Sequence, residues 1–370
     1  MHFAFLMRKH SLGEDCKAAM RLLSYVFTAL LTIAVQDILI IGTAMAQELP
    51  PPQSHWDYHL GQGLRLGDSG LTLGGYASAR YEILHDRKPQ FTLSALSFFL
   101  SWDTGTRVRF FSELKFEDVT VIKGPQAFTR RSNSFEIERL YADVYLSEIA
   151  TLRVGKFLTP IGRWNLIHAD PLVWTTSRPL ITSQSFAPNT TGGMLYGSLS
   201  PLGKDLDYSV YLEVTDDPDA IHSEGPFSEV AGVHVATHWG LAEWGVSYAH
   251  FVREAERNRE QHLVGADFFW THDRLEVTGE FLYRVGKDTG EGNEWGLFLQ
   301  GVAPLTTKLF AVGRYEFFDP RGPFSGMHLW VVGLAFRPLS PLVMRAEYNL
   351  AHENSARVPQ GFSASVALLF

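Results

Sequence analysis

The sequence predicts an all-β protein, an antiparallel transmembrane β-barrel of about 16 strands. Apolar and polar residues alternate with a period close to two along most of the chain after residue 70, which is the strand period. The links between the alternating segments are short and long in turn. The number of segments is even, as in closed bacterial barrels. A soluble β-sandwich could alternate in the same way. However, alternating short and long links along the whole chain are typical of a membrane barrel and not of a sandwich.

The alternating segments define the strands that we expect. They lie near residues 71–84, 91–102, 107–118, 135–146, 152–157, 192–200, 206–215, 229–239, 242–252, 261–271, 274–286, 294–302, 308–317, 328–337, 341–350 and 361–370. Short links such as 103–106 are expected on the periplasmic side, and long links such as 119–134 are expected outside the cell.

The composition agrees with a membrane barrel. Charged residues make up 19% of the 370 residues, below the quarter that is usual in soluble globular chains. The net charge of −8 argues against a nucleic-acid partner. Cys16 is the one cysteine of the chain, so we expect no disulfide in the mature protein. No cofactor and no metal site are expected.

Residues 1–46 are predicted to be a signal peptide. A basic start is followed by the apolar run 22–35 and by the small-x-small pattern Ala44-Met45-Ala46. The alternative is a membrane anchor that is not removed, and Met20 is an alternative to Met1 as the initiator. Residues 47–70 are predicted to form a periplasmic leader, and residues 71–370 the barrel.

The last predicted strand ends on Phe370 and alternates strictly before it. This ending resembles the assembly signal of outer-membrane barrels. The sequence therefore predicts the bacterial outer membrane as the location. The expected partners are outer-membrane lipid, lipopolysaccharide and the barrel-assembly machinery.

The side chains that alternate with the apolar face are rich in charge, and we expect them to line the lumen. Burying them without water would cost several kcal/mol each unless they were paired, whereas a water-filled lumen removes most of that cost. The predicted lumen-lining residues are Arg80, Glu82, Arg107, Arg109, Glu113, Lys115, Arg139, Arg284, Arg314, Glu316, Arg345 and Glu347.

Three predicted strands repeat the pattern Arg-x-Glu, which places both charges on one face. Two interpretations remain open: a path of fixed charges that guides ions, or ion pairs that stiffen the wall. The repeats are Arg80/Glu82, Arg314/Glu316 and Arg345/Glu347.

The long link from Leu158 to Thr191 is predicted to be the third outer loop and to fold into the lumen, where it narrows the channel. It carries Arg163, His168, Asp170 and Arg178, and four prolines reduce its freedom. The alternatives are an extracellular lid and a loop between subunits.

The segment Arg153-Val154-Gly155-Lys156-Phe157-Leu158-Thr159-Pro160-Ile161-Gly162 resembles a stretch of the phosphate-selective porin O and P family. The resemblance implies a trimeric barrel of 16 strands, with anion selection by arginines and lysines. By motif position it implies that Arg153, Lys156 and Arg163 lie near the constriction. The sequence departs from that family because the lysines after residue 46 are only seven and scattered, so phosphate is not predicted as the solute.

Together these patterns predict a porin that lets small hydrophilic solutes or ions diffuse passively, with a preference for anions. The alternative is a barrel without transport, a scaffold or an adhesin, whose lumen would be occupied by protein. An outer-membrane enzyme is the third interpretation. The sequence contains neither Gly-x-Ser-x-Gly nor His-Glu-x-x-His, so we expect no enzymatic activity.

Overall fold

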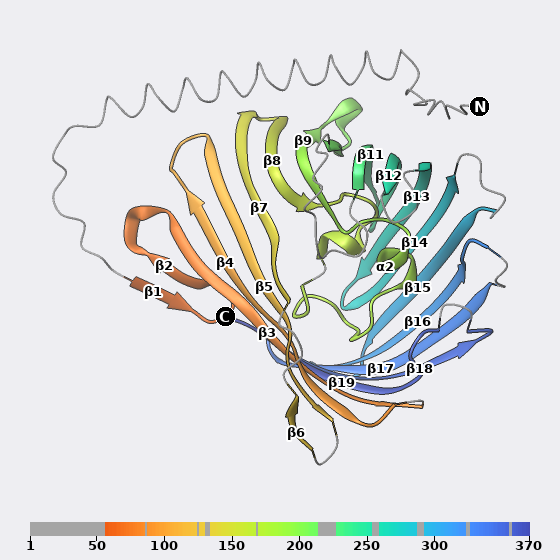
Figure 1. Ribbon diagram of the computed structural model, residues 1–370. Helices are drawn as coiled ribbons and strands as arrows, with labels where there is room; N and C mark the ends of the chain where they lie inside the picture. The colour runs from red at the N-terminus through yellow and green to blue at the C-terminus, as the bar shows by residue number, and fades with distance from the viewer. Residues whose placement is uncertain are drawn as a thin grey trace, which may run out of the picture. The chain divides into compact units, whose positions relative to one another are not determined.

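The structure is a computed structural model, and it describes residues 56–85, 87–123, 126–129, 134–167, 169–213, 227–253, 259–286, 292–322, 326–354 and 357–370. The predicted signal peptide, residues 1–46, therefore lies outside the described residues. The described chain is almost entirely β-sheet (Figure 1). Within it no helix is long and apolar enough to cross a bilayer.

The strands are β1 (Trp56–His59), β2 (Gly63–Leu66), β3 (Leu71–Leu84), β4 (Gln90–Asp103), β5 (Val108–Lys123), β6 (Gln126–Thr129), β7 (Ser134–Ser147), β8 (Ala150–Leu158), β9 (Asn189–Leu199), β10 (Leu206–Glu213), β11 (Phe227–Trp239), β12 (Ala242–Arg253), β13 (Arg259–His272), β14 (Leu275–Gly286), β15 (Glu294–Pro304), β16 (Leu309–Asp319), β17 (Met327–Leu339), β18 (Leu342–His352) and β19 (Gly361–Leu369).

Sixteen of the described strands close the barrel, because each pairs antiparallel with the next along the chain and β19 pairs with β3. All sixteen coincide with predicted strands, so the predicted fold class is confirmed. Three short strands are additional: β1 and β2 form a hairpin that pairs with the start of β3, and β6 pairs with the end of β5. The only α-helix among the described residues is α2 (Leu180–Gln184), between β8 and β9.

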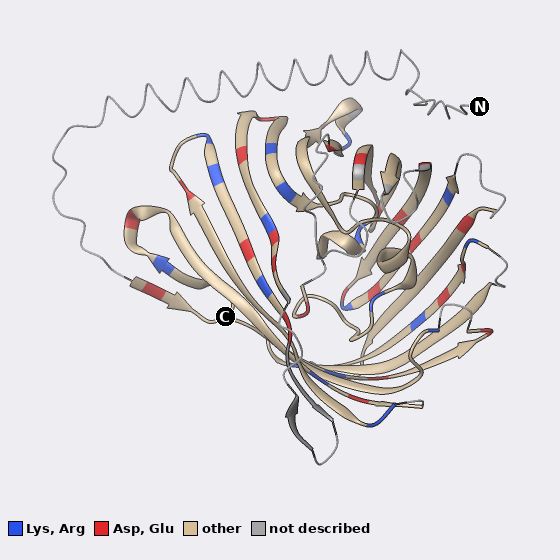
Figure 2. Cartoon of the chain, in the orientation of Figure 1, with Lys and Arg blue, Asp and Glu red and all other residues tan. Residues whose placement is uncertain are grey.

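The wall has two different faces, and β18 shows the contrast. Arg345 and Glu347 are each 4% exposed, whereas the neighbours Met344, Tyr348 and Leu350 are 40–50% exposed. Successive side chains of a strand point to opposite faces of the sheet. The outer face is therefore apolar and uncovered, and the inner face carries the charges. Figure 2 shows residues of both signs distributed along the strands of the wall.

Phe370 lies at the seam where the barrel closes. Its backbone exchanges two hydrogen bonds of 2.8 Å with Gly75 in β3. Its ring packs beside Gly75 and lies 6.2 Å from the ring of Phe98. The last residue thus extends the β19–β3 pairing and covers a glycine that leaves room for the ring.

Gly155 in β8 has a conformation that other residues rarely adopt, with φ of +128°. An ideal Cβ there would overlap the backbone carbonyl of Leu140 in β7. We predict that Gly155→Ala destabilises the barrel by roughly 1–3 kcal/mol, the usual cost of a strained backbone position. The measurement heats samples to a series of temperatures before electrophoresis and follows the fraction that still migrates as the folded barrel.

Gly301→Ala is the matched control, because Gly301 also lies in a wall strand and nothing lies within 4 Å of its ideal Cβ. It should melt like the wild type. Equal melting of both variants would show that the glycine conformation at residue 155 is not required.

Candidate channel interior

Most of the predicted lumen-lining residues lie on the inner face in ion pairs. Glu113 accepts from Arg139 at 2.6 Å, and Lys115 lies 2.6 Å from Glu117. The remaining pairs are Arg80–Glu82 at 3.7 Å, Arg284–Glu294 at 2.6 Å and Arg314–Glu316 at 2.7 Å.

Two predicted lumen residues lie at the edge of the barrel. Arg107 precedes β5 and is exposed. Arg109 pairs with Asp103 across the short β4–β5 turn at 3.1 Å, and 62% of its side chain is exposed. Both cations therefore lie at the end of the barrel where the short turns are.

The segment 159–188, which joins β8 to β9, is held against the inner face by wall carboxylates. Glu347 of β18 accepts the backbone N–H groups of Thr176 and Ser177 at 2.7 and 2.9 Å. Glu316 of β16 accepts the N–H of Leu180 at 2.6 Å. Carboxylates that accept backbone N–H groups form strong, charge-assisted hydrogen bonds. The segment therefore has fixed contacts with strands far away in the sequence.

The wall arginines bind the same segment through its carbonyl groups. Arg345 donates to the carbonyl oxygens of Asp170 and Thr175 at 2.9 and 3.0 Å. Arg314 donates to the carbonyl oxygen of Ser177 at 3.0 Å and to the hydroxyl of Thr175 at 2.6 Å. Two of the three Arg-x-Glu repeats thus anchor this segment, a role that neither sequence interpretation included.

Glu280 of β14 is a further anchor. Its Oε1 accepts the backbone N–H groups of Arg163 and Trp164 at 2.9 and 2.5 Å. Gly162, just before them, has φ of +64°, and a Cβ there would overlap the Glu280 carboxylate. The predicted motif glycine therefore lets the chain turn closely against a buried carboxylate.

The segment also packs into an apolar cluster that extends over the inner faces of β8–β17. Ile161 and Ile181 are at most 1% exposed, and their cluster includes Leu263, Leu282 and Phe298, each at most 2% exposed. These wall residues are therefore buried beneath the segment. Segment 159–188 therefore covers a large part of the inner face.

The inner face of β5–β8 is more open. The side chains of Arg139 and Arg153 are each 20% exposed, and that of Lys156 is 25% exposed. Arg153 makes two hydrogen bonds to Asp143, and Lys156 pairs with Glu136 at 3.1 Å. Arg153 and Lys156, which the family resemblance assigns to the constriction, thus lie on this accessible half of the wall.

The predicted constriction residues of the segment have different surroundings. Arg163 pairs with Glu243 at 2.6 Å and stacks over Phe269. The Asp170 carboxylate accepts from the hydroxyl of Ser78 in β3. Arg178 lies 5.1 Å from the ring of Trp164 and has no carboxylate within ion-pair distance among the described residues. His168 lies outside the described residues.

Residues that were not among the predicted site residues complete the anchoring. Glu276 accepts from the indole N–H of Trp174 at 2.7 Å. Arg337 stacks over Trp174 at 4.4 Å and donates to the carbonyl oxygen of Pro171 at 3.1 Å. The strand period places Glu276 on the inner face, but no pattern in the sequence indicates that it binds Trp174.

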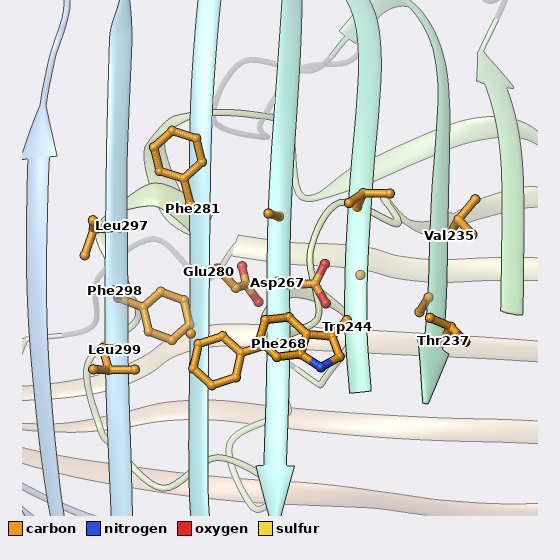
Figure 3. A pocket seen from close by; sticks show the side chains of 15 residues that line it. Val235, Thr237, Trp244, Asp267, Phe268, Glu280, Phe281, Leu297, Phe298 and Leu299 are labelled. Atoms are coloured by element: carbon orange, nitrogen blue, oxygen red, sulfur yellow. The ribbon is translucent and has the colours of Figure 1, made fainter. Parts of the chain in front are cut away.

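A groove of about 530 Å³ lies on the outer face of β11–β15 (Figure 3). Gly279 leaves space on that face, and the ring of Phe268 lies beside it. The groove is lined almost entirely by apolar atoms, including those of Trp244, Phe281 and Leu299. It belongs to the apolar outer surface and not to the charged interior. Among the described residues, no group of three or more His, Cys, Asp or Glu side chains could hold a metal ion.

Comparisons with known proteins identify the fold. The sequence matches no protein-family model, and no curated protein matches it. OmpF of Salmonella typhi, solved in complex with daunomycin, is similar in structure, with a TM-score of 0.58 and 13% identity over 85% of this chain and 99% of OmpF. The anion-selective porin from Comamonas acidovorans gives 0.56 and 11% over 81% and 98%.

A third similar structure is the outer membrane channel DcaP of Acinetobacter baumannii, with a TM-score of 0.56 and 11% identity over 84% of this chain and all of DcaP. Because these identities are low, the likeness shows the fold alone. The chain therefore has the barrel fold of outer-membrane porins and channels.

We predict that Glu347→Ala frees the middle of segment 159–188, because the N–H groups of Thr176 and Ser177 lose their acceptor. A hydrogen bond to a charged group contributes roughly 1.5–3 kcal/mol, so amide hydrogen exchange at these residues should accelerate at least about tenfold. Hydrogen–deuterium exchange with mass spectrometry measures it. Glu347→Gln retains one acceptor oxygen and should change the exchange less. Unchanged exchange in Glu347→Ala would contradict the anchoring role.

Proposed function

We propose that the protein is an outer-membrane porin, a water-filled channel for the passive diffusion of small hydrophilic solutes or ions. One observation carries the proposal: the closed wall is apolar and uncovered outside but charged inside. An apolar belt suits contact with lipid, and inner charges that remain partly exposed suit water. The fold shared with OmpF and with the anion-selective porin supports the same assignment.

In this proposal segment 159–188 is the constriction. Its support is the set of contacts with β12, β14, β16 and β18, which fix it against one half of the inner face. Solutes then pass between the segment and the half of the wall that carries Arg139, Arg153 and Lys156. The anchored segment narrows the lumen without filling it.

The proposal includes a modest preference for anions. Most inner-face cations are paired with carboxylates, so they add little net field. Arg178 is the exception among the described segment residues, because no carboxylate neutralises it. A fixed positive charge at a narrow point raises the local concentration of anions.

The proposal also includes lipopolysaccharide and outer-membrane lipid as surroundings, the barrel-assembly machinery as the insertion partner, and a homotrimer as the assembly. It assigns no enzymatic activity. The apolar outer face supports the lipid partner directly. Cross-linking in native membranes tests the trimer, and a phospholipid-hydrolysis assay tests the absence of lipase activity.

Purified protein added to a planar lipid bilayer should produce discrete conductance steps, because each inserted barrel opens one water-filled path. The measurement is the single-channel current in potassium chloride. A heat-denatured sample is the control. A bilayer that stays sealed after confirmed insertion would contradict the porin assignment.

Arg178→Ala should shift the reversal potential in a potassium chloride gradient toward cations, because the variant loses an unpaired positive charge at the proposed constriction. Arg178→Lys keeps the charge and should retain the selectivity of the wild type. An unchanged reversal potential in Arg178→Ala would place Arg178 away from the narrow point.

A further inference from the structure

Aromatic side chains follow one another across the inner face of the open half of the wall. Tyr76 of β3 lies 5.8 Å from Phe99 of β4, which lies 5.9 Å from Phe111 of β5, and Phe111 stacks on Tyr141 of β7 at 5.4 Å between ring centroids. Tyr196 of β9 lies on the other side of Arg153 from Tyr141, and both tyrosines also pack against the apolar cluster of segment 159–188. We call these five residues the aromatic track.

The lipid-facing role of aromatic residues does not explain the track. Outer-face rings such as Phe98 and Phe110 are 45% and 38% exposed, and they serve that role. Phe99 and Phe111 are their immediate neighbours and point inward, toward the charged face. Phe99, Phe111 and Tyr141 are half-buried, so each keeps part of its surface accessible inside the barrel. Contact with water alone does not account for aromatic rings at these inward-facing positions.

Ion pairs accompany the rings. The guanidinium of Arg139 lies 4.6 Å from the ring centre of Phe111, and that of Arg153 lies 3.8 Å from Tyr141 and 5.0 Å from Tyr196. Both arginines are neutralised, Arg139 by Glu113 at 2.6 Å and Arg153 by Asp143 at 2.7 Å. The track therefore offers hydrogen-bond donors and acceptors with little net charge.

Segment 159–188 approaches the beginning of the track. Ala169 packs against Tyr76, and the Asp170 carboxylate accepts from Ser78 on the same strand. Tyr76 is consequently 1% exposed, while the later rings stay accessible. A solute that passes the proposed constriction would move along Phe99, Phe111 and Tyr141.

We propose that the aromatic track binds uncharged, ring-shaped polyhydroxyl solutes, that is, sugars, during their passage. This inference rests on the porin function proposed above. A sugar ring has an apolar face of C–H groups, which suits the negative face of an aromatic ring, and a rim of hydroxyl groups, which suits paired guanidinium and carboxylate groups. An aromatic carboxylate could use the same rings, but it would need an unpaired cation beside them, and Arg139 and Arg153 are both paired.

The test is block of the single-channel current by maltotriose in a planar bilayer. Added at millimolar concentration, maltotriose should lower the current in a saturable way. Phe111→Ala combined with Tyr141→Ala should raise the half-blocking concentration at least about fivefold. Trp330→Ala, which removes a 53% exposed outer-face ring, should leave it unchanged. If the double variant does not insert, Phe111→Leu tests the same point with a smaller change.

The outcomes separate the two proposals. Full conductance without block by maltotriose would overturn the sugar inference and leave the porin intact. Block by benzoate but not by maltotriose would overturn it in favour of aromatic anions. Block that is equal in wild type and track variants would remove the track from the binding path. Absence of conductance would contradict the porin itself.

Discussion

The structure depends on how the charges of the inner face are satisfied. A carboxylate or guanidinium inside a barrel costs several kcal/mol if it is neither hydrated nor paired. On one side of the wall, Glu316, Glu347 and the Oε1 atom of Glu280 meet this requirement by accepting backbone N–H groups of segment 159–188. Arg314 and Arg345 meet it by donating to that segment's carbonyl groups. The charges of the wall and the backbone of the segment therefore stabilise each other.

This arrangement makes the interior asymmetric. The anchored segment brings Ile161, Ile181 and neighbouring apolar residues against the wall and buries the wall residues beneath them. The other half keeps its ion pairs partly exposed and carries the aromatic track. The proposed solute path follows from this division, because water and solutes have access only where the segment does not cover the wall.

The strand period predicted the fold but could not predict the anchoring. All sixteen wall strands have alternating residues, so the sequence located them within a few residues. Local irregularities were not visible: a register shift beside Glu113 places both Glu138 and Arg139 on the inner face. The short strands β1, β2 and β6 carry too few residues for a period. The strand period places the two charges of each Arg-x-Glu repeat on one face, but their partners lie 137–175 residues away in the sequence. Only the closed barrel brings them together.

The central claim is that one half of the inner face is open to water and the other is sealed by segment 159–188. Phe99 and Phe298 allow a matched test, because both are inner-face phenylalanines, the first half-buried and the second 2% exposed. Cys16 is the one native cysteine, so variants made on a Cys16→Ser background carry a single cysteine. Reaction with a charged, membrane-impermeant thiol reagent should modify Phe99→Cys and reduce its conductance while Phe298→Cys stays unmodified. Equal modification of both variants, or modification of Phe298→Cys alone, would contradict the account.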